Sequence, residues 1–312
     1  MPGHSGSRPC WAELAHPVNA QRALLDPGRW HFQHGPIDIV IGAEGDADAV
    51  AASHEAAWAR FQTVLPELVA ELRALRLPVR GPCALRGVIG RRMWLACQPH
   101  QSQFITPMAA VAGSVAQELV LCYEREGIER AWVNNGGDIA LHLAPGASVK
   151  VGLFADLARF DPSQPRLQTD GHFEVRAAMP VRGIATSGWR GRSFSLGIAD
   201  SVTVLARTAA MADAAATVIA NAVNVHDARI ERRPANQIKD DSDLGDIEVT
   251  VGVLPLDEAQ VARALQAGER RARELQREGL VHSAVLVCQH RLARVEARMP
   301  ATTSIELGSV FA

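Results

Sequence analysis

The pattern of apolar and polar positions predicts an early β-hairpin followed by a long helix. Trp30 to Phe32 and Ile37 to Ile41 are two short apolar runs around His34-Gly35-Pro36, a cluster of turn-forming residues. From about Ala47 to Leu77 the large apolar residues return at spacings of three or four, which is the period of an amphipathic helix. We expect Pro66 to mark a break or restart in this helix, because proline removes a helical hydrogen bond.

The middle of the chain is expected to alternate strands with one helix. The predicted strands are Met93–Cys97, Arg130–Val133, Ile139–Leu143, Val149–Leu153, Val181–Thr186 and Ser201–Leu205. Pro107 to Glu126 is rich in Ala, Val and Leu and is predicted to be a helix, in which Gly113 and Ser114 let a neighbouring backbone approach closely. We expect Val149–Leu153 to continue the main sheet and residues 156–179 to form an extended surface loop.

The last third is predicted to begin with an Ala-rich helix from Thr208 to Asn224. A charged segment from Asp227 to Asp246 is interpreted as a loop. The closing elements are a strand, an amphipathic helix and a strand, over Ile247–Val253, Asp257–Glu278 and Val281–Cys288. Hairpin-like links among these elements favour an α+β fold of mixed sheets packed with helices. We expect one compact domain over residues 21–312, a flexible tail over residues 1–20, and a ligand-binding half over about residues 107–225.

Composition narrows the classes of function. A net charge of −2, with 21% charged residues, gives no positive excess to hold a phosphate backbone, so no nucleic-acid partner is expected. Lys150 and Lys239 are the only lysines, which argues against covalent catalysis by lysine. The cysteines form no CxxC pair, which argues against a disulfide framework or a zinc knuckle. With no secretory signal and no long apolar stretch, we interpret the protein as cytoplasmic without a membrane partner, and Ala-rich helices leave room for a homodimer.

Three small-residue segments carry the candidate chemistry, and the first joins two predicted strands. In Asn134-Asn135-Gly136-Gly137-Asp138 the adjacent glycines allow positive φ and a close approach of backbone to a ligand. Asn-Gly between apolar runs is also the leading short-range signal for a plain hairpin turn, so that interpretation stays open. Asp138 beside two asparagines gives the turn more polar groups than a turn requires, which favours contact with a ligand.

The second segment is a loop that starts at Ala185 and ends near Ser195. Its polar or glycine members include Thr186, Ser187, Gly188, Arg190, Arg192 and Ser193. Hydroxyls, exposed backbone amides and guanidinium groups are the donors that bind an anion such as pyrophosphate. An ordinary polar loop with solvated arginines would have the same composition. No GxxxxGK[ST] or GxGxxG motif is present to decide between the two.

The third segment places polar side chains on one face of the Ala-rich helix. Asp213, Thr217 and Asn221 stand at i, i+4 and i+8 among Ala, Val and Ile residues. A carboxylate and a hydroxyl one turn apart can supply two of the oxygen ligands that Mg²⁺ prefers. The alternative is local: Asp213 would cap or pair nearby, and Thr217 would bond back to the preceding turn. We favour the metal site.

Motifs of other enzyme classes are weakly supported. Cys97 and His100 have no second pair at the spacing of zinc ligands. There is no GxSxG sequence, and no Ser or Cys can be matched to a His and an Asp from the sequence alone.

The chain resembles the ApbE-like family in four stretches that follow that family's order: AWVNNGGDIAL, IATSGWRGRSFS, DSVTVLA and MADAAATVIANAV. The best-known members are Mg²⁺-dependent FAD:protein FMN transferases. The resemblance implies that Asp213 and Thr217 coordinate Mg²⁺ and carry the catalysis. The residues that it places at FAD or FMN are Asn134, Asn135, Gly136, Gly137, Asp138, Thr186, Ser187, Gly188, Arg192 and Ser193.

The reaction implied by this resemblance is attack by a Thr or Ser hydroxyl of an acceptor flavoprotein on the FMN phosphate, with AMP leaving. Two departures separate this chain from the transferases. They carry a His-Ile-x-Asp-Pro-x-x-Gly segment before the DSVTVLA-like strand, whereas this chain runs directly from Gly197 to Asp200. In addition, Ala112 stands where the family has a lysine. Three functions stay open: a flavin transferase or FAD pyrophosphate-cleaving enzyme, a non-catalytic flavin-binding or flavoprotein maturation factor, and an enzyme for another small anionic substrate.

Overall fold

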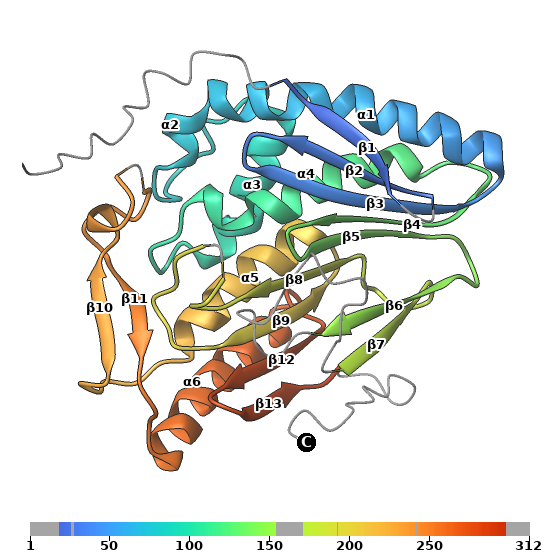
Figure 1. Ribbon diagram of the computed structural model, residues 1–312. Helices are drawn as coiled ribbons and strands as arrows, with labels where there is room; N and C mark the ends of the chain where they lie inside the picture. Colours follow the sequence, from blue (N-terminus) through green and yellow to red (C-terminus); the bar gives the residue numbers. More distant parts are fainter. Residues whose placement is uncertain (1–18, 26–27, 154–170, 192, 241, 298–312) are drawn as a thin grey trace, which may run out of the picture.

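The computed structural model describes residues 19–25, 28–153, 171–191, 193–240 and 242–297, and a nine-stranded antiparallel sheet runs through its centre (Figure 1). The strand order is β1-β2-β3-β4-β5-β8-β9-β12-β13. These strands are Gln21–Leu25, Arg29–His34, Ile37–Gly45, Ile128–Asn135, Asp138–Leu143, Gly183–Ser187, Ser201–Ala206, Ser283–Cys288 and Arg291–Val295. The predicted α+β class is confirmed.

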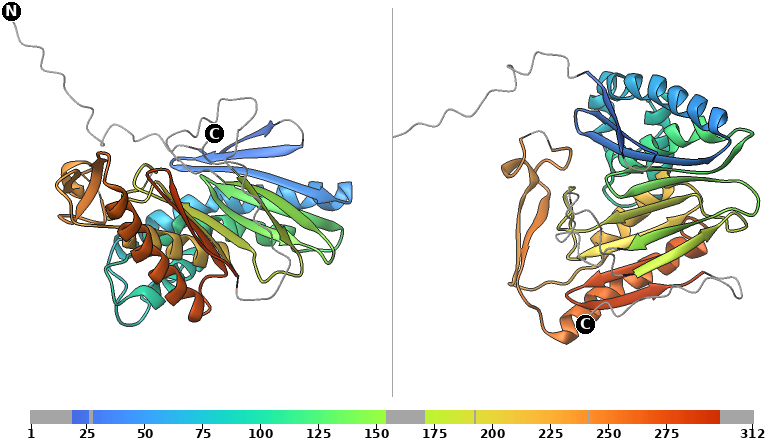
Figure 2. Two further views of the ribbon diagram at one scale, coloured as in Figure 1. Left: turned by 90° about the horizontal axis from the view of Figure 1, so that it is seen from below. Right: turned by 45° about the vertical axis from the view of Figure 1, so that its right-hand side comes forward.

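The helices pack on one face of this sheet, as the two views of Figure 2 show. They are α1 (Ala47–Ala70), α2 (Leu72–Leu75), α3 (Val88–Cys97), α4 (Val111–Val120), α5 (Ala209–Ala222) and α6 (Glu258–Arg277). The Ala-rich α5 is buried between the sheet and the neighbouring helices α4 and α6. None of the helices in the described part of the chain is long and apolar enough to cross a membrane.

The opposite face of the sheet carries a second, smaller core under a two-stranded ribbon. This ribbon pairs β6 (Ser148–Leu153) with β7 (Gly171–Arg176). Its Phe173 and Val175 pack on Leu141 of β5 and Ile184 of β8. Val149–Leu153 is therefore a strand as predicted, but the expectation that it continues the main sheet is wrong. β7 lies within the segment predicted as a surface loop, of which residues 156–170 lie outside the described residues, as do residues 1–18 of the predicted tail.

Met93 to Cys97 belongs to helix α3, so the predicted strand there is wrong. Two carboxylates from an upstream part of the chain complete the amino terminus of α3: Glu71 accepts the Gly87 N–H at 2.9 Å, and Glu67 accepts the Ile89 N–H at 3.1 Å. A short apolar run has no period that separates a strand from a buried helix. The contacts that decide the matter are about twenty residues away in sequence.

Pro66 does not interrupt α1, contrary to the prediction. The helix ends after Ala70, and Glu71 takes a non-helical φ of −114°. Phe61, Val64 and Leu68 lie buried on both sides of the proline. We infer that their packing holds the helix together despite the missing backbone donor.

The charged segment predicted as a loop contains β10 (Ile230–Pro234), which pairs with β11 (Glu248–Val253). Figures 1 and 2 show this hairpin at one side of the molecule, apart from the nine-stranded sheet. Two further strands were not predicted: β1, which pairs with β2, and β13, which forms a hairpin with β12 at the other sheet edge.

One end of the sheet collects three connections. Asn135 pairs with Asp138 across the β4–β5 turn, and Ser187 pairs with Val202 where the β8–β9 connection begins. Ser201 pairs with Val287, one residue before β12 ends, which brings the β12–β13 turn alongside. Two of the three candidate segments, the turn and the loop, therefore meet at this end.

Candidate functional site

The first candidate segment forms a two-residue hairpin turn between β4 and β5. Gly136 and Gly137 occupy the turn with φ of +65° and +111°, which explains the paired glycines. Asn134 accepts the Gly137 N–H at 2.8 Å, and Asn135 donates from its amide to the Ala112 carbonyl at 3.2 Å. Both asparagines thus serve the turn and its attachment to α4. Their contact with a ligand stays a prediction.

Asp213 ties α5 to the amino terminus of α4. Its Oδ2 accepts the Gly113 N–H at 2.9 Å, and its carboxylate also accepts a backbone hydrogen bond from Ala112. The helices approach closely because position 113 is glycine: a Cβ there would lie 2.3 Å from the Ala209 carbonyl oxygen. The expectation of a close backbone approach at this glycine is confirmed. The capping alternative is also realised, although Asp213 caps α4 rather than its own helix.

Asp138, at the start of β5, lies beside Asp213. Only 9% of Asp138 is exposed, and its Oδ1 accepts the Thr186 N–H at 3.1 Å. Burial, and then the nearby Asp213 carboxylate, raise the pKa of Asp138 well above its usual range. Burial likewise raises the pKa of Asp213 to about 7, against two backbone hydrogen bonds that lower it. Among the described residues neither carboxylate forms an ion pair with Lys, Arg or His.

The β8–β9 connection contributes its first residues to the same place. The hydroxyls of Thr186 and Thr203 hydrogen-bond across the strands at 2.9 Å. A Cβ on Gly188 would lie 2.4 Å from the Asp200 carbonyl oxygen, so only glycine fits there. Ser187 is partly exposed at the end of β8. The structure thus brings Thr186 next to Asp138 across the pair β5–β8.

Asp213, Thr217 and Asn221 share a face of α5, and each keeps some exposed surface among buried neighbours. Asn221 has a structural partner: its Oδ1 accepts the Leu196 N–H at 2.9 Å and lies 3.2 Å from the Ser195 hydroxyl. Within the described part of the chain, Thr217 makes no side-chain hydrogen bond, so the alternative in which it bonds back to the preceding turn is not observed there.

The contacts of Ser193 and Arg192 with a ligand stay predictions. Ser193 is exposed in the β8–β9 connection, and Arg192 lies outside the residues that the structure describes. A zinc site at Cys97 and His100 gains no support, since the described residues contain no group of three or more His, Cys, Asp or Glu side chains that could hold a metal ion.

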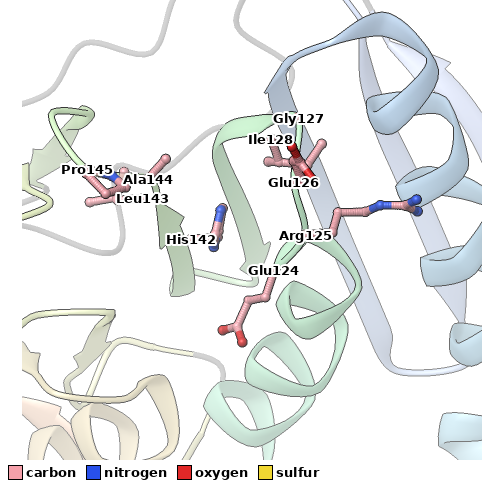
Figure 3. Close-up of a pocket in the computed structure, with 9 residues that line it drawn as sticks. All are labelled: Glu124, Arg125, Glu126, Gly127, Ile128, His142, Leu143, Ala144 and Pro145. Atoms are coloured by element: carbon pink, nitrogen blue, oxygen red, sulfur yellow. The ribbon is translucent and has the colours of Figure 1, made fainter.

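A shallow hollow of about 560 Å³ lies away from this site (Figure 3). Its lining residues are Glu124, Arg125, Glu126, Gly127, Ile128, His142, Leu143, Ala144 and Pro145. They stand where β4 begins and β5 ends, whereas the Gly136-Gly137 turn lies at the other end of the same hairpin. The hollow therefore contains none of the candidate site residues.

Sequence reasoning missed Asp200, the residue before β9. It is buried, and two neighbouring segments, Trp189-Arg190 and the turn at Gln289, contact its carboxylate. The sequence signal is an Asp directly before a strand rich in apolar residues, and it is weak because Asp is common at turns.

The fold and the site together define an α+β protein with a carboxylate pair, Asp138 and Asp213, at the end of an antiparallel sheet. Comparison of sequences identifies its family: the family model described as AbpE bacteria matches residues 22–298, and the chain belongs to this ApbE-like family. A UPF0280 protein of Methanosarcina barkeri is 30% identical over 227 residues, which cover 70% of this chain and 82% of that protein. A UPF0280 protein of Methanosarcina acetivorans is 29% identical over 68% of this chain and 79% of its own length.

Solved structures of similar fold include the ApbE protein of Thermotoga maritima, with a TM-score of 0.43 and 12% identity over 89% of this chain and 96% of that one. The apo form of the Pseudomonas stutzeri flavinyl transferase ApbE has a TM-score of 0.41 and 10% identity, over 90% and 95% of the two chains. These similarities are distant.

Proposed function

We propose that this protein binds a flavin nucleotide, FAD or FMN, together with a divalent cation held at Asp213 and Thr217. The observation that carries the proposal is the pair of carboxylates Asp138 and Asp213, which are close enough for one charge to raise the pKa of the other. Two neighbouring acids without an ion-pair partner in the described structure are costly when ionised. A bound cation would remove that cost.

The donor atoms fit Mg²⁺ better than a softer metal. Asp213 offers carboxylate oxygen in addition to the Oδ2 bonded to Gly113, and the Thr217 hydroxyl lies one helical turn away. Asp138 adds negative charge beside them. The set contains only oxygen, and phosphate oxygens of a ligand could complete it.

The activity that this family membership favours is transfer of FMN from FAD to an acceptor protein, or cleavage of the FAD pyrophosphate. In the transfer, a Thr or Ser hydroxyl oxygen of the acceptor bonds to the FMN phosphorus, the bond from that phosphorus to AMP breaks, and the hydroxyl proton is released to solvent. The cation would neutralise negative charge on the pyrophosphate. Thr186, Ser187 and Gly188 are the residues that we expect to hold the phosphates.

A second candidate is flavin binding without turnover, in a storage or maturation factor. The connection from Gly188 to Asp200 favours binding without turnover. Most of its buried residues contact other residues of the same connection or the carboxyl end of α5. Such a connection offers little extra chain to contact a ligand. Ala112, whose carbonyl accepts a bond from Asn135, also has no charged side chain to offer. An enzyme for another small anionic substrate is the third candidate.

Product analysis separates these functions. Purified protein is incubated with FAD and Mg²⁺, and mass spectrometry follows AMP, FMN and covalently attached flavin; chelation with EDTA and the Asp213→Asn variant are the tests of the site. Asp227→Asn is the matched control, since Asp227 is a similarly enclosed carboxylate paired with Arg229 away from the site. Mg²⁺-dependent AMP release that Asp213→Asn abolishes supports the enzyme. FAD binding without AMP release supports the second candidate. If the protein neither releases AMP nor binds FAD, both candidates are wrong.

A further inference from the structure

Asp200 is a buried carboxylate wedged between two turns at the site end of the sheet. Only 8% of the residue is exposed. Its Oδ1 accepts the indole N–H of Trp189 at 3.3 Å, and its Oδ2 accepts the backbone N–H of Gln289 at 2.5 Å. The Arg190 Nε lies 3.9 Å from Oδ1. The carboxylate thus joins the start of the β8–β9 connection to the β12–β13 turn.

The β12–β13 turn has a strained backbone, because two residues with side chains occupy positions that favour glycine. Gln289 and His290 have φ of 42° and 64°, and they are the only non-glycine residues with positive φ in the described part of the chain. A two-residue turn of this kind ordinarily takes Asn-Gly. Such backbone persists only where surrounding contacts hold it, and it gathers at functional sites.

Contacts on two sides hold Gln289 in that conformation. Its side-chain oxygen accepts the Leu256 N–H at 2.8 Å, and its side-chain nitrogen donates to the Leu254 carbonyl at 2.9 Å. Its backbone N–H is the donor to Asp200. The turn therefore presents a fixed donor to the carboxylate, anchored on the segment between β11 and α6.

The residues Gly188 to Arg190 lie directly against Asp200 on its other side. Gly188 packs on the Asp200 carbonyl so closely that a Cβ would not fit. The Trp189 N–H donates to the Ala199 carbonyl at 3.0 Å, and the Arg190 guanidinium lies 4.9 Å from the centre of the Trp189 ring. These residues follow Thr186 and Ser187, so their position sets where the connection's donors point.

We propose that Asp200 is a positioning residue, which fixes Gly188–Arg190 against the strained β12–β13 turn so that the adjoining Thr186, Ser187 and Gly188 can receive the phosphates of the ligand. The inference rests on the proposed function, because it takes the β8–β9 connection as the phosphate-binding segment. Asp200 does not touch the ligand. Electrostatics alone would make Asp200 unfavourable for an anion, so a positioning role and a purely electrostatic role predict effects of opposite sign.

The test is the affinity of the Asp200→Asn variant for anions. Asparagine has one carbonyl oxygen where Asp200 uses two, so it cannot satisfy both the Trp189 and the Gln289 donors. We expect the variant to bind FAD and inorganic pyrophosphate, each measured by calorimetry with Mg²⁺, about tenfold more weakly or worse, which is the usual scale for a lost hydrogen bond to a charged group. Asp227→Asn is the control, because the side chains of Asp200 and Asp227 are both 11% exposed and each is paired with an arginine. Its affinities should equal those of the wild type.

A second variant covers the case in which Asp200→Asn does not fold. Trp189→Phe removes only the indole donor to Asp200 and keeps an aromatic ring, and hydrogen exchange in residues 186–200 should then rise while exchange in α5 stays unchanged. Equal or tighter anion binding by Asp200→Asn would overturn the positioning role. If the wild type binds pyrophosphate but not FAD, the flavin proposal fails and the comparison is decided on pyrophosphate alone. If it binds neither, both proposals are wrong.

Discussion

The carboxylate pair should make the metal-free protein more stable in mild acid than at alkaline pH. The pKa of Asp213 is raised from its ordinary 3.8 to about 7, mainly by burial. Each pKa unit corresponds to about 1.4 kcal/mol, so ionising Asp213 costs roughly 4 kcal/mol more in the folded protein than in the unfolded chain. The unfolded chain loses the proton near pH 4, whereas the folded chain keeps it to about pH 7. The native state therefore binds more protons between these values, and its stability falls as the pH rises through that window.

The assay is urea unfolding of wild type and Asp213→Asn at pH 5, 6, 7 and 8 in EDTA. Because the variant has one acceptor oxygen for α4 where Asp213 has two, and this difference is the same at every pH, the informative quantity is the change with pH in the stability difference between the two proteins. We expect that difference to move by a few kcal/mol in favour of the variant from pH 5 to pH 8. For Asp227→Asn the difference from the wild type should stay constant from pH 5 to pH 8, since Arg229 lowers the pKa of Asp227 from an ordinary value that already lies below pH 5. If the difference in unfolding free energy between the wild type and Asp213→Asn stays constant from pH 5 to pH 8, the pKa of Asp213 is not raised.

Three further changes test packing around the site, all by urea unfolding. Gly113→Ala should destabilise the protein by about 2 kcal/mol, because the new Cβ meets a carbonyl oxygen of α5 at 2.3 Å. The control Gly252→Ala should destabilise it less, because its Cβ meets only the flexible side chain of Glu231. Equal losses of stability would contradict the close approach at Gly113. His100 is 1% exposed, and burial lowers its pKa to about 4. Its contribution to the unfolding free energy is present above pH 6.5 and should fall by about 3 kcal/mol between pH 6.5 and pH 4. A His100→Gln variant whose stability has the same pH dependence as the wild type would exclude this. Tyr123→Phe should cost about 1–2 kcal/mol, because it leaves the buried His54 Nδ1 without its 2.6 Å partner; an unchanged midpoint would argue against that bond.

Local patterns predicted the elements on either side of the candidate site. Two glycines between apolar runs indicated the β4–β5 turn, and the structure has both at positive φ. Alternation and helical spacing found β8, β9 and α5 to within two residues. They failed at α3, whose amino terminus depends on Glu67 and Glu71, and at Pro66, where buried neighbours outweigh a missing donor.

The site itself could be predicted only in part. Helical spacing correctly placed Asp213, Thr217 and Asn221 on one face. It could not show that Asn221 accepts a hydrogen bond from the Leu196 N–H, or that Asp213 lies beside Asp138. The two carboxylates are brought together by the packing of α5 against β5 and β8. The role of Asp200 depends on a turn almost ninety residues later, which no local pattern indicates.

If Asp213 and Thr217 hold a cation needed for flavin-nucleotide binding, Mg²⁺ must change the affinity for FAD. Calorimetric titration of FAD at pH 8, with and without Mg²⁺, tests it most directly. We expect Mg²⁺ to tighten FAD binding to the wild type and to Asp227→Asn by at least about tenfold, the scale of one interaction with a charged group, and to have no effect on Asp213→Asn. Wild-type binding that is indifferent to Mg²⁺, or an equal Mg²⁺ effect in Asp213→Asn, would contradict it.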